Sequence, residues 1–253
     1  MGDYIAAGDA RIWFEERGQG DPLVLMHGGF SDSRDFHGSL DRLSAHFRVY
    51  TPERRGHGHS PDVEGPFTGE IMAADMTAFL EKAVGGPAHL AGYSAGATVA
   101  LHVARNRPDL VRSLVLISGA FHRDGWIIAP TEEGEMPQPV VDGYAEVSPD
   151  GRDHFPVIVS KIVAMAQGDP GLTEVDLAKV TARTLVMSGD DDIVHLEHSV
   201  ALYRGLPAGE LAIVPRTTHL LMFEKPELVT HLVTDFLTRE PTPTFMPIRR
   251  AAQ

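Results

Sequence analysis

One serine in the chain has the sequence surroundings of a nucleophile. Ser94 is the central residue of GYSAG, where AHLAGYS, typical of a strand, passes directly into SAGATVAL, typical of a helix. Such a tight turn strains the backbone of its central residue and exposes its side chain, and the flanking glycines let strand and helix approach each other. The start of the helix would also stabilise negative charge beside the hydroxyl. The spacing therefore predicts that Ser94 is the nucleophile of an acyl-transfer reaction.

Such a serine needs a base to take its proton and a carboxylate to orient that base. His219 is the candidate base because it alone among the histidines lies in the loop directly after the last expected strand, in LAIVPRTTH. Two acids of SGDDD are candidates for the carboxylate that orients this base. We favour Asp192, which stands far enough into its loop to turn toward His219, over Asp190, which directly follows the strand.

The negative oxygen that forms during acyl transfer needs hydrogen-bond donors. The N–H group of Ala95, the residue after the nucleophile, is one donor by geometry. The second should come from the loop MHGGF, whose glycines let backbone amides point into the site. We favour Gly29 for this role, with Phe30 as the alternative, and we expect His27 to pack the loop rather than to act in catalysis.

The elements that position these residues alternate along the chain. Apolar or β-branched runs at 22–29, 47–53, 88–94, 111–119, 182–192 and 209–219 are typical of strands, and helical patterns occupy 69–86 and 95–110. This alternation predicts an α/β fold with a mostly parallel sheet and helices on both faces.

A long insertion interrupts the alternation. The chain between Gly119 and Thr184 is far longer than the dozen or so residues that a crossover needs. We interpret residues 121–182 as a small cap over the carboxyl edge of the sheet, where open α/β sheets bind ligands. Its one clear helical run is 154–168.

The remaining divisions of the chain are a core of residues 1–120 and 183–239 and a C-terminal tail of residues 240–253. Three large apolar side chains of the cap are candidates to line a substrate pocket: Phe121, Trp126 and Phe155.

Composition excludes several kinds of partner and chemistry. A length of 253 residues with 43% hydrophobic content allows a full core, and a net charge of -13 argues against nucleic acid or an acidic membrane as partner. The absence of cysteine removes disulfides and thiolate chemistry. His57 and His59 form an H-x-H pair, but no further histidine follows at metal-ligand spacing, so we expect no metal site. We expect a soluble, cytoplasmic protein that uses no cofactor.

Taken together, the motifs resemble those of the α/β-hydrolase superfamily from about residue 22 to residue 236. They are HGGF, PERRGHGHS, GYSAG, SGDDD and RTTH. The segments GYSAGATVAL and RNRPDLVRSLVLISG are similar to the branch of biphenyl-hydrolase-like and valacyclovir-hydrolase-like enzymes. Many of those carry Asp where this chain has Ala95, and in the valacyclovir type that aspartate holds the amino group of the substrate. Glu53 stands where relatives usually have Asp, and we expect little consequence.

The resemblance implies an α/β-hydrolase fold and a serine hydrolase mechanism. The expected reaction is cleavage of a small carboxylic ester or lactone through an acyl-enzyme on Ser94. Two alternatives stay open at this point. One is hydrolysis of a carbon–carbon bond in a diketone, and the other is a ligand receptor that keeps the three residues without turnover.

Overall fold

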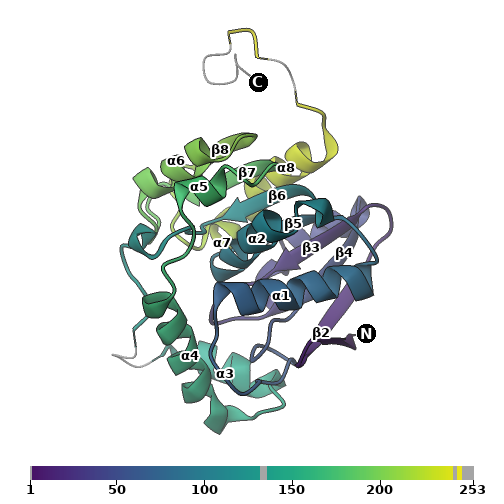
Figure 1. The fold of residues 1–253 in the computed structure, drawn as a ribbon, viewed down its shortest axis with the longest axis vertical. Helices are drawn as coiled ribbons and strands as arrows, with labels where there is room; N and C mark the ends of the chain where they lie inside the picture. Colours follow the sequence, from purple (N-terminus) through teal and green to yellow (C-terminus); the bar gives the residue numbers. More distant parts are fainter. Residues whose placement is uncertain (1, 132–135, 242–243, 247–253) are drawn as a thin grey trace.

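The computed structural model describes residues 2–131, 136–241 and 244–246, and within them one sheet of eight strands forms the centre of the molecule (Figure 1). The strands lie in the order β1-β2-β4-β3-β5-β6-β7-β8. Their bounds are β1 Asp3–Ala7, β2 Ala10–Arg17, β3 Pro22–Met26, β4 Arg48–Pro52, β5 Ala88–Tyr93, β6 Val111–Ile117, β7 Arg183–Gly189 and β8 Gly209–Val214. β1 pairs with β2, and β2 with β4, in antiparallel fashion, whereas all other neighbours are parallel. The expected α/β fold with a mostly parallel sheet is confirmed.

Helices cover both faces of the sheet. The longer ones in the core are α1 Gly69–Phe79, α2 Ala95–Asn106, α6 Leu196–Gly205 and α8 Pro226–Thr238, with the short α7 Leu221–Glu224 before α8. A π-helical turn, η3 Leu80–Val84, extends α1, and two 3-10 turns, η1 Ser33–Phe36 and η2 Leu40–Ala45, follow β3. Apolar side chains of α1, α2 and α6 share one buried cluster, and those of η1, η2 and α8 share another. Because both faces are covered, the central strands are almost continuously buried, which explains their unbroken apolar runs.

The described part of the segment proposed as a cap contains three α-helices, α3 Gln138–Val147, α4 Phe155–Gly168 and α5 Glu174–Leu177. α3 and α4 lie together at the lower end of the molecule in Figure 1. The sequence pattern predicted α4 but not α3, whose Gly143 and paired valines lower its helix propensity. Tertiary contacts stabilise α3 instead, because Arg34 donates to the Gly143 carbonyl at 2.6 Å and pairs with Glu146 at 2.7 Å.

None of the described helices is long and apolar enough to cross a membrane. Much of the expected C-terminal tail, residues 242–243 and 247–253, lies outside the described part of the chain.

Candidate active site

The turn between β5 and α2 has the strained backbone that its sequence predicts. Ser94 adopts φ 53° and ψ -120°, in a region that non-glycine residues rarely occupy. A Cβ atom on Gly92 would lie 2.4 Å from the carbonyl oxygen of Gly96, and a Cβ atom on Gly96 would lie 2.1 Å from that of Met26. Only glycine therefore fits at the two positions that flank the serine.

The structure brings together the three residues predicted to form the triad. The Ser94 hydroxyl lies 2.9 Å from Nε2 of His219, and Nδ1 of His219 lies 2.7 Å from Oδ1 of Asp192. Because a carboxylate only accepts, Nδ1 carries the proton and Nε2 is free to accept the proton of the hydroxyl. The three residues follow β5, β8 and β7, whose carboxyl ends meet at one edge of the sheet.

Asp192 is held by several donors besides His219. Its Oδ2 accepts from the hydroxyls of Ser118 at 2.6 Å and Ser188 at 3.1 Å, and its Oδ1 from the N–H of Val194 at 3.2 Å. Burial opposes the charge of this carboxylate, but the hydrogen bonds from His219 and Ser118 hold the pKa of Asp192 below its ordinary value. The sequence reasoning missed both serines, although each is the polar residue at the carboxyl end of a strand next to the site.

The competing acid has a different contact. Asp190 is exposed and accepts the N–H of Thr217 at 3.1 Å, so it shapes the loop before His219 without touching the imidazole. Tyr93 also positions this loop, because its hydroxyl donates to the carbonyl of His219 at 3.1 Å.

The loop after β3 lies beside Ser94. Gly29 and Phe30 line the same cavity as Ser94 and Ala95, and a Cβ atom on Gly29 would lie 3.6 Å from that of Ala95. The N–H groups of Gly29, Phe30 and Ala95 form no hydrogen bond to another residue of the described chain. All three are therefore available to a ligand oxygen.

The cavity at Ser94 has a volume of about 330 Å³. Phe121 and Trp126 line it as expected, and the Trp126 ring lies edge-on to the imidazole of His219, with centroids 6.1 Å apart. Most of the remaining wall is apolar, and it includes Val99, Ala120, Ile128, Ile162 and Met165. Two charged side chains that the sequence reasoning missed, Arg123 and Asp169, also line the cavity.

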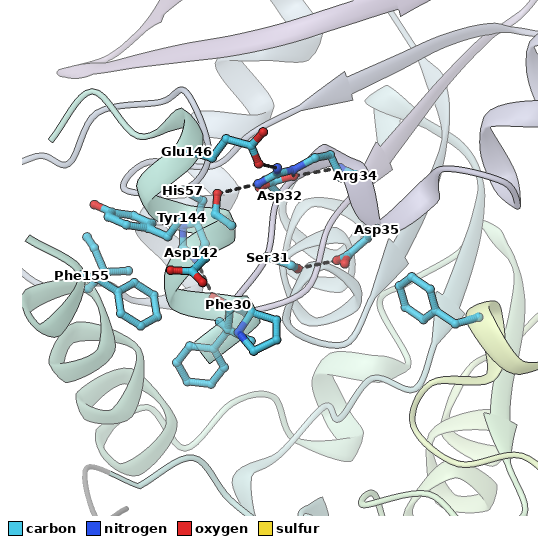
Figure 2. A pocket seen from close by; sticks show the side chains of 17 residues that line it. Phe30, Ser31, Asp32, Arg34, Asp35, His57, Asp142, Tyr144, Glu146 and Phe155 are labelled. Carbon is cyan, nitrogen blue, oxygen red and sulfur yellow. Dashed lines mark hydrogen bonds and ion pairs between the residues drawn. The ribbon is translucent and has the colours of Figure 1, made fainter. Parts of the chain in front are cut away.

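Phe155, the third residue predicted to line a substrate pocket, is not among the residues that line the cavity at Ser94. It lines a neighbouring cavity of about 810 Å³ that shares Gly29 and Phe30 with the first (Figure 2). Phe155 is the first residue of α4, and its ring packs against Tyr144 of α3 with centroids 5.0 Å apart. Ile162, two turns further along α4, reaches the cavity at Ser94, as do Met165 and Ala166 of the same helix.

Two acids of the proposed cap lie in the larger cavity as well. Asp142 pairs with Arg152, and Glu146 pairs with Arg34. Neither acid lines the cavity at Ser94.

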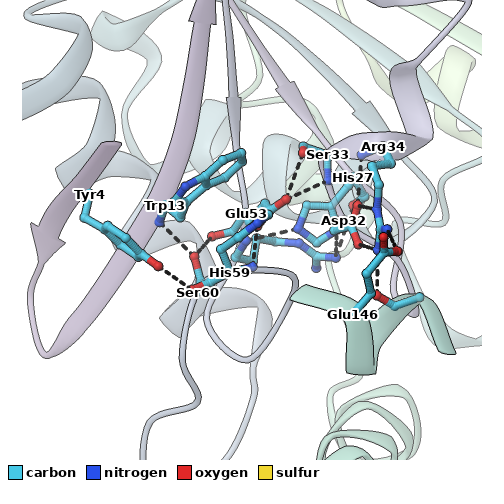
Figure 3. A network of polar contacts seen from close by, with 12 residues as sticks. Tyr4, Trp13, His27, Asp32, Ser33, Arg34, Glu53, His59, Ser60 and Glu146 are labelled. Carbon is cyan, nitrogen blue, oxygen red and sulfur yellow. Dashed lines mark hydrogen bonds and ion pairs between the residues drawn. The ribbon is translucent and has the colours of Figure 1, made fainter. Parts of the chain in front are cut away.

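Buried polar residues lie behind the loop after β3. Glu53, only 1% exposed, accepts from the hydroxyl of Ser33 at 2.8 Å and contacts Nδ1 of His59 at 3.0 Å (Figure 3). Glu53 thereby joins the loop after β4 to η1. The two histidines of the H-x-H pair have different partners, because His59 stacks on Trp13 whereas both ring nitrogens of His57 face backbone carbonyls.

Asp35 contacts the same loop from another side. Its Oδ2 accepts the N–H of Gly28 at 2.8 Å and the hydroxyl of Ser31. Burial outweighs these hydrogen bonds and raises the pKa of Asp35 to about 6.

Comparison with known proteins defines the family. Residues 23–232 match the model of the alpha/beta hydrolase family, so the chain belongs to this family. A pyrrolizixenacetamide deacetylase of Xenorhabdus hominickii is 28% identical, with 94% of this chain and 99% of the deacetylase aligned. The solved structure of a thermophilic esterase from Thermogutta terrifontis matches with a TM-score of 0.76 at 25% identity, over 94% of this chain and 98% of the esterase.

Other relatives align over shorter segments. A pimeloyl-(acyl-carrier protein) methyl ester esterase of Yersinia pestis is 34% identical over 46% of this chain and 45% of its own length. Two further curated relatives align over 47% and 66% of their length. The chain thus spans between about half and two thirds of several curated relatives.

The buried carboxyl of Asp35 predicts a pH-dependent stability. Its pKa of about 6 in the folded chain exceeds the value of about 3.9 for an unfolded aspartate, so stability is lost as the pH rises through this window. Asparagine keeps an acceptor for the Gly28 N–H but does not ionise. We expect the free energy of unfolding of Asp35→Asn, relative to the parent, to rise by about 2 to 3 kcal/mol between pH 4 and pH 7. Urea denaturation at several pH values measures this, and a difference that does not vary with pH would contradict it.

Proposed function

We propose that this hydrolase cleaves a small carboxylic ester or lactone through an acyl-enzyme on Ser94, without a cofactor. The observation that carries the proposal is the continuous hydrogen-bonded chain from Ser94 through His219 to Asp192 at the wall of an apolar cavity. The names of two relatives, a deacetylase and an esterase, agree with acyl transfer to water. The net charge of -13 favours a small-molecule substrate over nucleic acid.

In the proposed first half-reaction, the Ser94 oxygen attacks the carbonyl carbon while Nε2 of His219 takes the hydroxyl proton. The carbonyl oxygen becomes negative and accepts from the N–H groups of Ala95 and Gly29, with Phe30 as the alternative to Gly29. The tetrahedral intermediate then collapses, the bond to the alcohol oxygen breaks, and His219 gives its proton to that oxygen. The acyl group remains on Ser94 as an ester.

In the second half-reaction, water replaces the alcohol. His219 takes a proton from the water, whose oxygen attacks the acyl carbon, and the same amides hold the second oxyanion. Collapse breaks the bond to Ser94, which recovers its proton from His219, and a carboxylic acid is released. Asp192 keeps the imidazole in one tautomer and stabilises its positive form throughout.

Substrate size and polarity follow from the cavity in this proposal. A volume of about 330 Å³ walled by Phe121, Trp126 and Ile162 fits a small apolar acyl or alcohol group. Residues 121–182, as the proposed cap, supply these three side chains.

Ser94→Ala tests the mechanism directly. We expect it to lower kcat by about 10⁴-fold or more without unfolding the protein, because the hydroxyl contributes little to the core. A panel of chromogenic esters, lactones and thioesters, assayed with a thermal melt of each variant, measures both effects. Retention of activity within tenfold of the parent would overturn the mechanism. A folded parent chain with no turnover on any class would favour the receptor alternative.

The assignment of the acid predicts an order of effects. Asp192→Asn should lower kcat by about 10⁴-fold, because the amide no longer fixes the tautomer of His219. Asp190→Asn is the matched control from the same loop, and it should stay within about tenfold of the parent, because its side chain touches Thr217 and not the imidazole. Steady-state kinetics measure kcat of both variants. A larger loss of kcat in Asp190→Asn than in Asp192→Asn would show that the acid is Asp190.

Ala95 predicts discrimination by substrate charge. A carboxylate at this position could pair with an α-ammonium group, a contact worth about 1.5 to 3 kcal/mol, and alanine offers none. We expect a phenylpropionyl ester to be preferred over its phenylalanyl counterpart by at least about tenfold in kcat/KM, and Ala95→Asp to narrow the difference. If the parent favours the amino ester, the argument fails, and Asp169→Asn would then show whether the other acid in the cavity is responsible.

A further inference from the structure

The carbonyl groups of three successive residues in the loop after β3, His27, Gly28 and Gly29, are turned toward buried donors. Arg54 donates through Nη2 to the carbonyl of Gly28 and, at 3.1 Å, to that of His27. The next carbonyl, that of Gly29, lies 2.7 Å from Nε2 of His57. Arg54 is 1% exposed and His57 is 3% exposed, so both donors lie within the protein and not at its surface.

These contacts determine where the N–H groups of the loop point. In a trans peptide, the carbonyl of one residue and the N–H of the next point in opposite directions, and no cis peptide occurs in the described chain. The Gly29 N–H therefore points away from Arg54, and the Phe30 N–H points away from His57. Both residues line the cavity at Ser94, and neither N–H has a partner within the described chain.

We propose that His57 is a positioning residue of the oxyanion hole, whose Nε2–H group donates to the Gly29 carbonyl and, together with Arg54, fixes both peptide planes around Gly29. This role rests on the proposed function, because it concerns the amides that would hold the oxyanion. It is a role in orientation, since the imidazole contacts the loop and not the reacting atoms.

The loop needs such support because two glycines precede Phe30. Glycine has the widest choice of backbone angles, so an unsupported Gly28–Gly29 segment would place its amides in many directions. An oxyanion hole acts through donors that are already oriented before the charge forms, and removing one donor typically costs about 10² to 10³ in kcat. A backbone amide that remains in the loop but is no longer held in position should lower kcat by part of that factor.

The proton on the imidazole decides whether the contact is a hydrogen bond. Both nitrogens of His57 face carbonyl oxygens, Nδ1 that of Arg55 at 2.8 Å and Nε2 that of Gly29. Burial, together with the charge of Arg54, lowers the pKa of His57 to about 4, so at neutral pH the ring carries one proton and can donate only once. With the proton on Nδ1, the lone pair of Nε2 would face the Gly29 oxygen and repel it. The proposed role therefore requires the proton on Nε2.

Three substitutions separate this hydrogen bond from simple packing. His57→Phe keeps an aromatic ring against Phe67, on which the imidazole now stacks, but removes the donor. His57→Gln places an amide N–H near the position of Nε2, whereas His57→Asn places one near the position of Nδ1. His59→Phe is the matched control, because His59 is in the same loop and stacks on Trp13, while its Nδ1 contacts Glu53 and not a carbonyl of the loop after β3.

The measurements are kcat and KM on the best ester of the panel, the inhibition constant of an alkyl trifluoromethyl ketone, and that of the alcohol product, which has no carbonyl oxygen. The ketone adds to Ser94 and places a negative oxygen in the hole, whereas the product does not. We expect His57→Phe and His57→Asn to lower kcat by about 10- to 100-fold, with KM within about threefold of the parent. The inhibition constant of the ketone should rise by the same factor as kcat falls, and that of the product should not change. His57→Gln should recover most of kcat, and His59→Phe should stay within about twofold of the parent.

Several outcomes would overturn the proposal. They are an unchanged kcat in His57→Phe, an equal loss of kcat in the Gln and Asn variants, or an equal rise in the inhibition constants of the ketone and the product. If His57→Phe does not fold, the comparison of Gln with Asn still decides. Failure of the proposed function would look different, because the parent chain itself would then show no turnover that depends on Ser94.

Discussion

The backbone conformation of Ser94 is the constraint on which the rest of the site depends. A positive φ at a non-glycine residue costs about 1 to 3 kcal/mol and persists only where the surroundings compensate for it. Here β5 lies between β3 and β6 within the sheet, and α2 buries Val99, Leu101 and Val103, each contributing about 1.5 to 3 kcal/mol. The packing of the helix thus exceeds the strain. Removing that packing would relax the turn and withdraw the hydroxyl from His219.

The parts of the site that follow from chain order and strand position could be predicted from the sequence. Ser94 and His219 were placed by the elements on either side of them, since residues at the carboxyl ends of parallel strands meet at one edge of the sheet. The choice of Asp192 over Asp190 rested on distance along the loop. The structure has the same arrangement, with Asp192 at 2.7 Å from the imidazole.

The parts that depend on how elements dock could not be predicted. Phe155 was expected to line a substrate pocket, and the docking of α4 decides which cavity it lines. A helix rises about 1.5 Å per residue, so this first residue of α4 lies about 10 Å along the axis from Ile162, which reaches the cavity at Ser94. α3 was missed because its stability comes from Arg34 and not from its own propensity. The contact of Ser118 with Asp192 likewise joins residues far apart in the chain. The sequence shows that Ser118 lies at the carboxyl end of a strand, but not that it reaches Asp192.

The arrangement of charge explains how so few polar groups can serve the reaction. Acids around the loop after β3 have partners within the protein. Asp35 accepts the Gly28 N–H, and Asp32 and Glu146 pair with Arg34, while the wall around Ser94 is mostly apolar. In apolar surroundings an electrostatic interaction is several times stronger than in water. A donor that points toward the oxyanion therefore stabilises it strongly, and a donor that points elsewhere loses that stabilisation. In the proposed mechanism, the mostly apolar wall and the buried donors behind Gly28 and Gly29 act together. The wall would strengthen each hydrogen bond to the oxyanion, and the buried donors would keep the amides pointing toward it.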